Sequence, residues 1–133
     1  MTKDELLAMP SDCYMNEAQL SFFSSVLADM SMDLAECSDA AMRHLRTIQT
    51  ASDIADQADL VSEREATLRL ASRLAQQSKN VVDAMNRIAS GEFGYCVGTG
   101  EEIGIARLLH APESPYSIAE QERMERLRSL RAA

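Results

Sequence analysis

The sequence is poor in aromatic residues, glycine and proline. Of its 133 residues only 5% are aromatic, none is tryptophan, and there are 5 glycines and 3 prolines. Alanine, leucine, serine, glutamate and arginine are plentiful instead. This composition favours helix over sheet, and it predicts long helices packed against each other with a modest core elsewhere.

Cysteine is also scarce. The three cysteines, Cys13, Cys37 and Cys96, are odd in number and widely spaced, so they do not form a disulfide framework. They indicate free thiols in a reducing compartment. The sequence contains no apolar run long enough for a signal peptide or a bilayer span. We therefore expect a cytoplasmic protein with no membrane contact.

Basic residues are too few to balance the acidic ones, and the formal net charge is -8. Residues 1–66 carry 13 acidic and 4 basic side chains, whereas residues 67–133 carry 8 and 9. Proteins that bind DNA normally present a basic face to the phosphates, so this balance argues against direct DNA binding. An acidic half suits a basic surface, or a metal-bearing site, on a protein partner.

A long apolar series predicts the first long helix, from Asn16 to residue 50. Asn16 and Gln19 form a capping-box pattern at its start, after a short helix over residues 3–9 that stops before Pro10. Steps of three and four residues then continue over about four heptads, as in a coiled-coil seam. The seam comprises Leu20, Phe23, Leu27, Met30, Leu34, Cys37, Ala41, Leu45 and Ile48.

A second, weaker series predicts a helix that begins at Ser62, with Glu65 in the capping-box position, and ends at Gly91. Its seam comprises Thr67, Leu70, Leu74, Gln77, Val81, Ala84 and Ile88. The short linker favours pairing of the two seams within one chain, as an antiparallel coiled-coil hairpin over residues 16–90 with its tip near 51–61. Pairing of each seam with a second chain is the alternative; we expect a monomer.

Residues 91–133 differ in amino-acid composition from the predicted hairpin. Four glycines and two prolines lie between Phe93 and Tyr116, which indicates turns around a short helix at residues 102–109. A final helix is predicted from Ser117 to the C-terminus, with arginines late in it, where they favour the helix dipole. The sequence thus predicts a mainly α protein with an N-terminal segment (1–15), a hairpin (16–90), and a small globular domain with a C-terminal helix (91–133).

The predicted hairpin tip carries two acidic residues, Asp53 and Asp56, followed by Ala58. Aspartate is common in solvated loops, and that is one interpretation of these residues. Their position at the end of a long arm suggests another, namely that the arm delivers carboxylates into a deep channel. There they would hydrogen-bond basic residues or perturb a metal-bound site.

Cys96, Thr99, Ser117 and Glu120 form a second candidate group, spaced like two pairs of metal ligands. A structural zinc site takes four cysteine or histidine ligands, and this group has one, so zinc binding is not expected. Ser117 and Glu120 also fit a capping box, with Ser117 accepting from the Glu120 amide and Glu120 reaching back to the Ser117 amide. No enzyme motif is present, since the sequence lacks a phosphate-binding glycine loop with lysine and a metalloprotease helix motif.

Four stretches of the sequence together resemble the DksA/TraR family. They are YMNEAQL (14–20), the tip D-x-x-D-x-A at Asp53, Asp56 and Ala58, GEFGYC (91–96), and EIGIARL (102–108). They cover nearly the whole chain in the family's order, and the FGYC…EIG block is the most specific of them.

The resemblance implies a regulator that binds the secondary channel of bacterial RNA polymerase and acts in the stringent response. It implies a coiled-coil arm, a small zinc-finger domain and a C-terminal helix. It assigns Asp53 and Asp56, with Ala58 beside them, to the regulatory tip, and Arg73 to contact with the channel rim. The nucleotide alarmone ppGpp is the co-regulator of many members.

The sequence departs from the family pattern at two kinds of position. The four zinc-ligand positions of the family fall on Cys96, Thr99, Ser117 and Glu120, which indicates a degenerate, zinc-independent domain with no metal cofactor. The basic positions that help to bind ppGpp fall on three uncharged residues, with Lys79 and Arg123 next to two of them; the three are Asn80, Ala111 and Gln121. The resemblance therefore leaves the use of ppGpp open.

Three rival hypotheses stand beside the polymerase regulator. One is a channel factor of the transcript-cleavage type, whose tip carboxylates would hold a catalytic magnesium. Another is a structural coiled coil without a polymerase partner. The third is a redox or metal sensor that works through Cys96, which lacks a predicted resolving cysteine.

Overall fold

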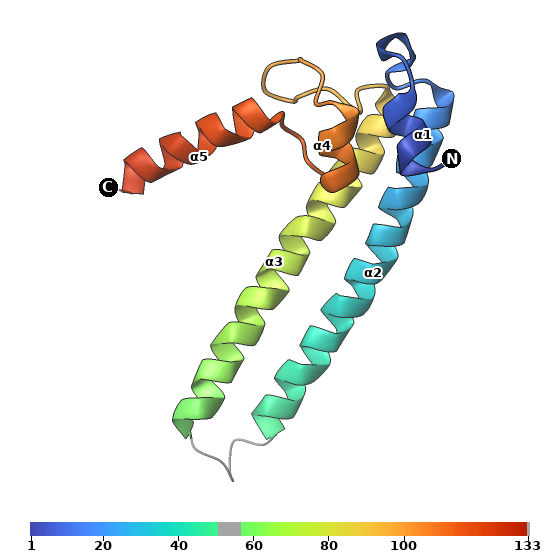
Figure 1. Ribbon diagram of the computed structural model, residues 1–133. Coiled ribbons are helices and arrows are strands. Elements are labelled where there is room, and N and C mark those ends of the chain that lie inside the picture. The colour runs from blue at the N-terminus through green and yellow to red at the C-terminus, as the bar shows by residue number, and fades with distance from the viewer. Residues whose placement is uncertain (51–56, 133) are drawn as a thin grey trace. The chain divides into compact units, whose positions relative to one another are not determined.

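The computed structural model describes residues 1–50 and 57–132, and helices account for most of them (Figure 1). Strands are absent from these two ranges, apart from one isolated antiparallel bridge between Tyr95 and Glu102. The helices are α1 (Lys3–Ala8), η1 (Ser11–Cys13, a 3-10 turn), α2 (Glu17–Thr50), α3 (Gln57–Ser90), α4 (Ile105–His110) and α5 (Ile118–Ala132). The mainly α fold expected from the composition is confirmed.

The chain divides into two units. Residues 1–28 and 80–133 form the first, and residues 29–79 form the second. Helices α2 and α3 each contribute to both. None of the described helices is both long enough and apolar enough to cross a membrane.

In the second unit, residues 29–50 of α2 and 57–79 of α3 lie side by side and antiparallel (Figure 1). Buried side chains from α2 recur at steps of three, four and seven residues, which keeps them on the face toward α3. They are Leu34, Ala41, Leu45 and Ile48, and Thr67 is their buried counterpart on α3. His44 on α2 also contacts Glu63 on α3, with 2.8 Å between Nε2 and Oε1. The predicted hairpin pairing within one chain is confirmed.

Two seam positions were assigned wrongly from the sequence. Cys37 is exposed, and Leu70 is 40% exposed whereas its neighbour Ala71 is half-buried. A side chain one residue off the seam is rotated by about 100° around a helix, which is enough to turn it toward solvent. The seam on α3 therefore passes through the small Ala71 and not through the larger Leu70.

The start of α3 also differs from the prediction. The helix begins at Gln57, five residues before Ser62, so Ser62 and Glu65 lie within the helix and not at its cap. Asp59 in the first turn favours this earlier start, because a carboxylate there interacts well with the helix dipole. The end of α3 is as predicted: Gly91 has φ 81°, and the Glu92 amide donates to the Arg87 carbonyl at 2.9 Å.

The start of α2 is capped almost as predicted. The Gln19 amide donates to Oδ1 of Asn16 at 2.9 Å. The reciprocal bond, however, runs to Met15 and not to Asn16, since Oε1 of Gln19 accepts from the Met15 amide at 2.7 Å. Gln19 is fully buried, with only 1% of its surface exposed, so these bonds give its polar side chain the hydrogen-bond partners that water cannot supply there.

In the first unit the apolar core gathers around two phenylalanines. Phe23 on α2 and Phe93 after α3 are buried, and their ring centroids lie 5.5 Å apart. Other buried apolar side chains of the unit come from five segments of the chain: Leu6, Leu27, Val81, Ala84, Cys96 and Leu108. Through Cys96, the loop that follows α3 is part of this core.

Tyr14 connects the N-terminal segment to the loop after α3. Its hydroxyl donates to the Gly94 carbonyl at 2.5 Å and accepts from the Gly104 amide at 2.9 Å. Its ring packs edge-to-face against the Tyr95 ring, with 5.7 Å between the two ring centroids. Gly94 is required here, because a Cβ at this position would lie 2.6 Å from the Met15 side chain. The hydroxyl thus ties together segments that lie 80 and 90 residues away in sequence.

Replacement of Tyr14 by phenylalanine is expected to lower the free energy of unfolding by about 1–3 kcal/mol. The change removes the hydroxyl and leaves the Gly94 carbonyl and the Gly104 amide without this partner. Urea denaturation followed by circular dichroism measures the loss. Tyr95→Phe is the matched control, because the Tyr95 side chain is 37% exposed. Equal stability of the two variants would contradict this role for Tyr14.

Candidate functional site

The structure places the predicted site residues at several locations. Asp53 and Asp56, the predicted tip carboxylates, lie outside the described residues. Ala58 lies in the first turn of α3 and is exposed. Arg73 lies on the exposed surface of the same helix in the second unit. Both described side chains are therefore accessible to a partner.

The group around Cys96 is brought together in the first unit. Cys96 is buried, with 2% of its surface exposed, in the loop that follows α3. Backbone bonds fix this loop: the Cys96 amide donates to the Glu101 carbonyl at 2.7 Å, and the Gly100 amide donates to the Cys96 carbonyl at 2.8 Å. The Val97 amide donates to the Pro115 carbonyl at 2.8 Å, which holds the segment before α5 against the loop.

Hydrogen bonds around the Cys96 sulfur favour its thiolate. Burial raises the pKa of this thiol. Hydrogen bonds from the Thr99 hydroxyl and from the backbone amides of Ser117, Thr99 and Gly98 lower the pKa by more than burial raises it, so that its value is about 7. Thr99 and Ser117, two of the degenerate zinc-ligand positions, therefore lower the pKa of the Cys96 thiol in place of binding a metal with it.

Glu120, the fourth position of the group, is paired with an arginine. Its carboxylate accepts two bonds from Arg123, at 3.0 Å from Nε and 2.7 Å from Nη2. This interaction lowers the pKa of the Glu120 carboxyl. The Glu120 amide donates to Oγ of Ser117 at 3.2 Å, so half of the predicted capping box is present. The other half was predicted wrongly, because the guanidinium of Arg123 is a stronger partner for the carboxylate than a backbone amide.

The residues at these four positions do not fit zinc. They supply one thiolate, two hydroxyls and a carboxylate that is already held by Arg123, whereas structural zinc takes cysteine and histidine ligands. Over residues 1–50 and 57–132, no group of three or more histidine, cysteine, aspartate or glutamate side chains could hold a metal ion. The bond from the Val97 amide to the Pro115 carbonyl links the loop to the segment before α5, whereas the bonds of Glu120 lie within α5 and its N-terminal cap.

We expect a metal chelator to leave the protein folded. The loop and α5 are held by hydrogen bonds and apolar packing, so removal of divalent metal should not change the urea midpoint of the purified protein. Denaturation curves with and without EDTA test this expectation. A chelator-induced loss of helicity would show that a metal contributes to the fold.

The Cys96 thiol is expected to make stability depend on pH between 7 and 9. Its pKa is lowered to about 7 in the folded protein from an ordinary value of 9.0. The unfolded chain therefore binds more protons in this range, and stability should rise as the pH increases from 7 to 9 and fall again as the pH returns through 7. Urea midpoints across this range measure the effect. Cys96→Ser should lose the added rise, whereas the double variant Cys13→Ser/Cys37→Ser should retain it.

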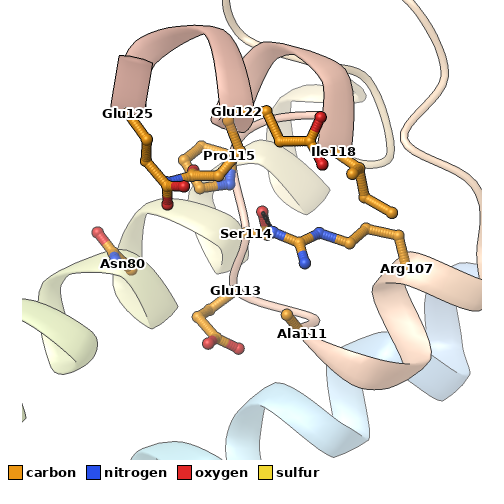
Figure 2. Close-up of a pocket in the computed structure, with 10 residues that line it drawn as sticks. Asn80, Arg107, Ala111, Glu113, Ser114, Pro115, Ile118, Glu122 and Glu125 are labelled. Carbon is orange, nitrogen blue, oxygen red and sulfur yellow. Dashed lines mark hydrogen bonds between the residues drawn. The ribbon is translucent and has the colours of Figure 1, made fainter. Parts of the chain in front are cut away.

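A pocket of about 420 Å³ lies on another part of the first unit, between α3, α4 and the start of α5 (Figure 2). Asn80, Ala111 and Gln121, the positions at which the resemblance implies contacts to ppGpp, all line it. The structure therefore brings these three positions together around one cavity, although they are distant in sequence.

The charge of this pocket is unsuited to a polyanion. Three carboxylates line it, from Glu113, Glu122 and Glu125, against a single guanidinium from Arg107. Arg107 points toward Ser114, with 3.4 Å between Nη2 and Oγ (Figure 2). Sequence reasoning missed these acidic residues, because only folding brings Glu113 to the same cavity as the two glutamates of α5. Their combined charge would repel a ligand that carries several phosphates.

Comparisons with known proteins agree over nearly the whole chain. Residues 91–126 match the family described as "Prokaryotic dksA/traR C4-type zinc finger". The RNA polymerase-binding transcription factor DksA of Caulobacter vibrioides is 33% identical over 114 residues, which cover 85% of this chain and 80% of that protein. The protein of the same description from Escherichia coli K12 is 31% identical over 112 residues, covering 82% and 73%.

A solved structure extends the likeness to three dimensions. Transcription factor DksA2 from Pseudomonas aeruginosa superposes with a TM-score of 0.84 and 35% sequence identity. The alignment covers 96% of this chain and 99% of that one. The likeness therefore includes the segments that form the helices as well as the globular domain.

Proposed function

Because this chain belongs to the DksA/TraR family, we propose that it is a transcription regulator that binds the secondary channel of bacterial RNA polymerase. The observation that carries this proposal is the extent of the likeness, which is not confined to the zinc-finger segment. It covers 85% of this chain and 80% of the DksA protein of Caulobacter vibrioides, and 96% of this chain and 99% of the DksA2 structure. The proposed mechanism is contact with the polymerase, without catalysis by this chain and without direct DNA binding.

The second unit supports the role of the hairpin as an arm. Residues 29–50 and 57–79 bury their apolar faces against each other, so the pairing is complete within one chain and is consistent with a monomer. In the proposed mechanism the tip residues Asp53 and Asp56 approach the polymerase active site, with Ala58 beside them. The exposed Arg73 contacts the channel rim.

The acidic pocket supports a regulator that works without ppGpp bound at this pocket. Asn80, Ala111 and Gln121 provide no positive charge, and three carboxylates surround them. We propose that this protein acts in the cytoplasm on initiation through its tip, and that ppGpp does not strengthen its effect through this pocket. The absence of a fitting ligand set for zinc similarly supports a domain that folds without metal.

Transcription in vitro from a ribosomal RNA promoter tests the proposal. Purified RNA polymerase is assayed with and without this protein, and each condition is repeated with and without ppGpp. We expect inhibition that depends on the protein and is equal in the two ppGpp conditions. A protein-dependent increase in transcript cleavage would support the cleavage-factor hypothesis instead. If the protein neither changes transcription nor binds RNA polymerase, the structural coiled-coil hypothesis would be supported instead.

A further inference from the structure

The charge of the acidic pocket in the first unit is not neutralised by ion pairs within the chain (Figure 2). Three carboxylates line this pocket, from Glu113, Glu122 and Glu125, and Arg107 contributes one guanidinium. None of the ion pairs found within residues 1–50 and 57–132 includes any of these four side chains. Three negative charges and one positive charge leave the lining with a net charge of -2. Such a lining attracts cations.

Two of these charged side chains have buried atoms without hydrogen-bond partners. Oε2 of Glu113 and Nε of Arg107 are buried, and neither is hydrogen-bonded within the part of the chain that the structure describes. Arg107 is directed toward Ser114 instead, with 3.4 Å between Nη2 and Oγ. A buried polar atom without a partner is unfavourable, and more so when its group is charged. Because a carboxylate shares its charge between both oxygens, a cation beside Glu113 would offset part of this cost.

The three carboxylates do not converge on one point. Figure 2 shows Glu122 and Glu125 on α5 and Glu113 on the segment that precedes it. Among the described residues, no group of three or more histidine, cysteine, aspartate or glutamate side chains could hold a metal ion. A divalent metal ion needs several oxygens around a single centre. The arrangement therefore favours a ligand whose positive charges are separated from one another.

Apolar side chains complete the lining. They are Ala111, Pro115 and Ile118, and Ile118 is 53% exposed, so its surface is open to a ligand. The volume of about 420 Å³ lies within the range of roughly 300–1,000 Å³ that is typical of small-molecule sites. A ligand that fits this lining has cationic groups joined by an apolar chain.

We propose that the acidic pocket binds a linear aliphatic polyamine. One ammonium group would contact Glu113, and another would contact Glu122 or Glu125. The methylene groups between them would lie against Ala111 and Ile118. A polyamine carries two or more ammonium groups at neutral pH, which match the charge of the lining, and each donates hydrogen bonds to carboxylates. The inference goes beyond the proposed function, because it assigns a small-molecule ligand to this chain.

Calorimetric titration of the full-length protein with spermidine tests the proposal. We expect saturable binding of one spermidine per chain, which should weaken as salt is added, because the side chains of Glu122 and Glu125 are exposed. Glu122→Gln/Glu125→Gln should raise the dissociation constant about tenfold, since glutamine keeps the size of the side chain but removes its charge. Glu122→Asp/Glu125→Asp should retain most of the affinity.

Glu36→Gln/Glu65→Gln is the matched control. It removes two exposed carboxylates from the second unit, so the net charge of the chain changes by the same amount. Any general attraction of spermidine to an acidic protein therefore weakens equally in the two double variants. We expect the control to bind spermidine as the unaltered protein does. Equal weakening in both double variants, or heat that does not saturate, would indicate diffuse counterion binding and overturn the inference.

Backbone amide chemical shifts locate the bound ligand. Spermidine should shift the amides of Asn80, Ala111 and Gln121, which line the pocket, and magnesium chloride at equal ionic strength should not. An equal response to magnesium would overturn the inference. Weaker polymerase binding by Glu122→Gln/Glu125→Gln, combined with no spermidine binding to the unaltered protein, would assign the pocket to a basic side chain of a protein partner and overturn it also. The proposed function is tested by transcription and stands or falls separately.

Discussion

Replacement of both Asp53 and Asp56 by asparagine is expected to abolish the effect on transcription initiation and to leave polymerase binding largely intact. Asparagine keeps the size of the side chain but removes its charge. Hydrogen bonds to charged groups contribute about 1.5–3 kcal/mol each, so loss of two such interactions at a reactive centre would reduce the effect at least tenfold. These residues lie between the end of α2 at Thr50 and the start of α3 at Gln57.

In vitro transcription and polymerase affinity, measured on the same preparation, separate the two roles. Asp33→Asn/Asp39→Asn is the matched control, because it removes two exposed carboxylates from α2. This control should regulate transcription as the unaltered protein does. Loss of binding or of helicity in the Asp53/Asp56 variant would show that the tip carboxylates have a structural role instead.

Replacement of Phe93 by alanine is expected to have the largest effect on stability. Phe93 is 1% exposed and packs against the fully buried ring of Phe23. Loss of a buried phenylalanine side chain removes apolar contacts and leaves a cavity, at a cost of about 3–5 kcal/mol. A small domain is stable by only about 5–15 kcal/mol, so the variant should lose a large share of its stability.

Urea denaturation measures this loss, and Leu130→Ala is the control. Leu130 is 73% exposed, so its truncation should change the free energy of unfolding by less than about 0.5 kcal/mol. An equally small change in Phe93→Ala would mean that the core of the first unit tolerates the cavity.

Local patterns in the sequence were sufficient to predict the long helices. The 3/4 spacing on α2 identified Phe23, Leu27 and Leu34 as buried, because a packed helix shows its buried face through this repeat. The errors fell where the repeat is ambiguous. The alanine at position 71 packs toward α2 in place of the more apolar Leu70, and the Ser62 pattern resembles a cap although it lies within α3.

Contacts between distant residues could not be predicted in the same way. No local pattern indicates that the Tyr14 hydroxyl bonds Gly94 and Gly104, or that Glu113 joins the glutamates of α5 in one pocket. The arginines of α5 were visible in the sequence, but they were interpreted through the helix dipole. Three of them, Arg123, Arg128 and Arg131, line one pocket together with Gly98 of the loop after α3, and no local pattern in the sequence indicates this grouping. The pairing of Glu120 with Arg123 was accessible from the i, i+3 spacing, and it was missed because the capping box offered another partner.

The bonds of Tyr14 also set an order for folding during synthesis on the ribosome. The second unit comprises residues 29–79 alone, so its helices can pair as soon as that stretch has emerged. Tyr14 must wait until Gly104 has left the exit tunnel, because one of its two bonds is made 90 residues downstream. At roughly 5–20 residues per second, the N-terminal segment stays unattached for several seconds after its own synthesis. Nascent chains stalled before residue 104 should therefore carry a protease-sensitive N-terminus. It should become protected once the Tyr14 hydroxyl has formed its bonds to Gly94 and Gly104.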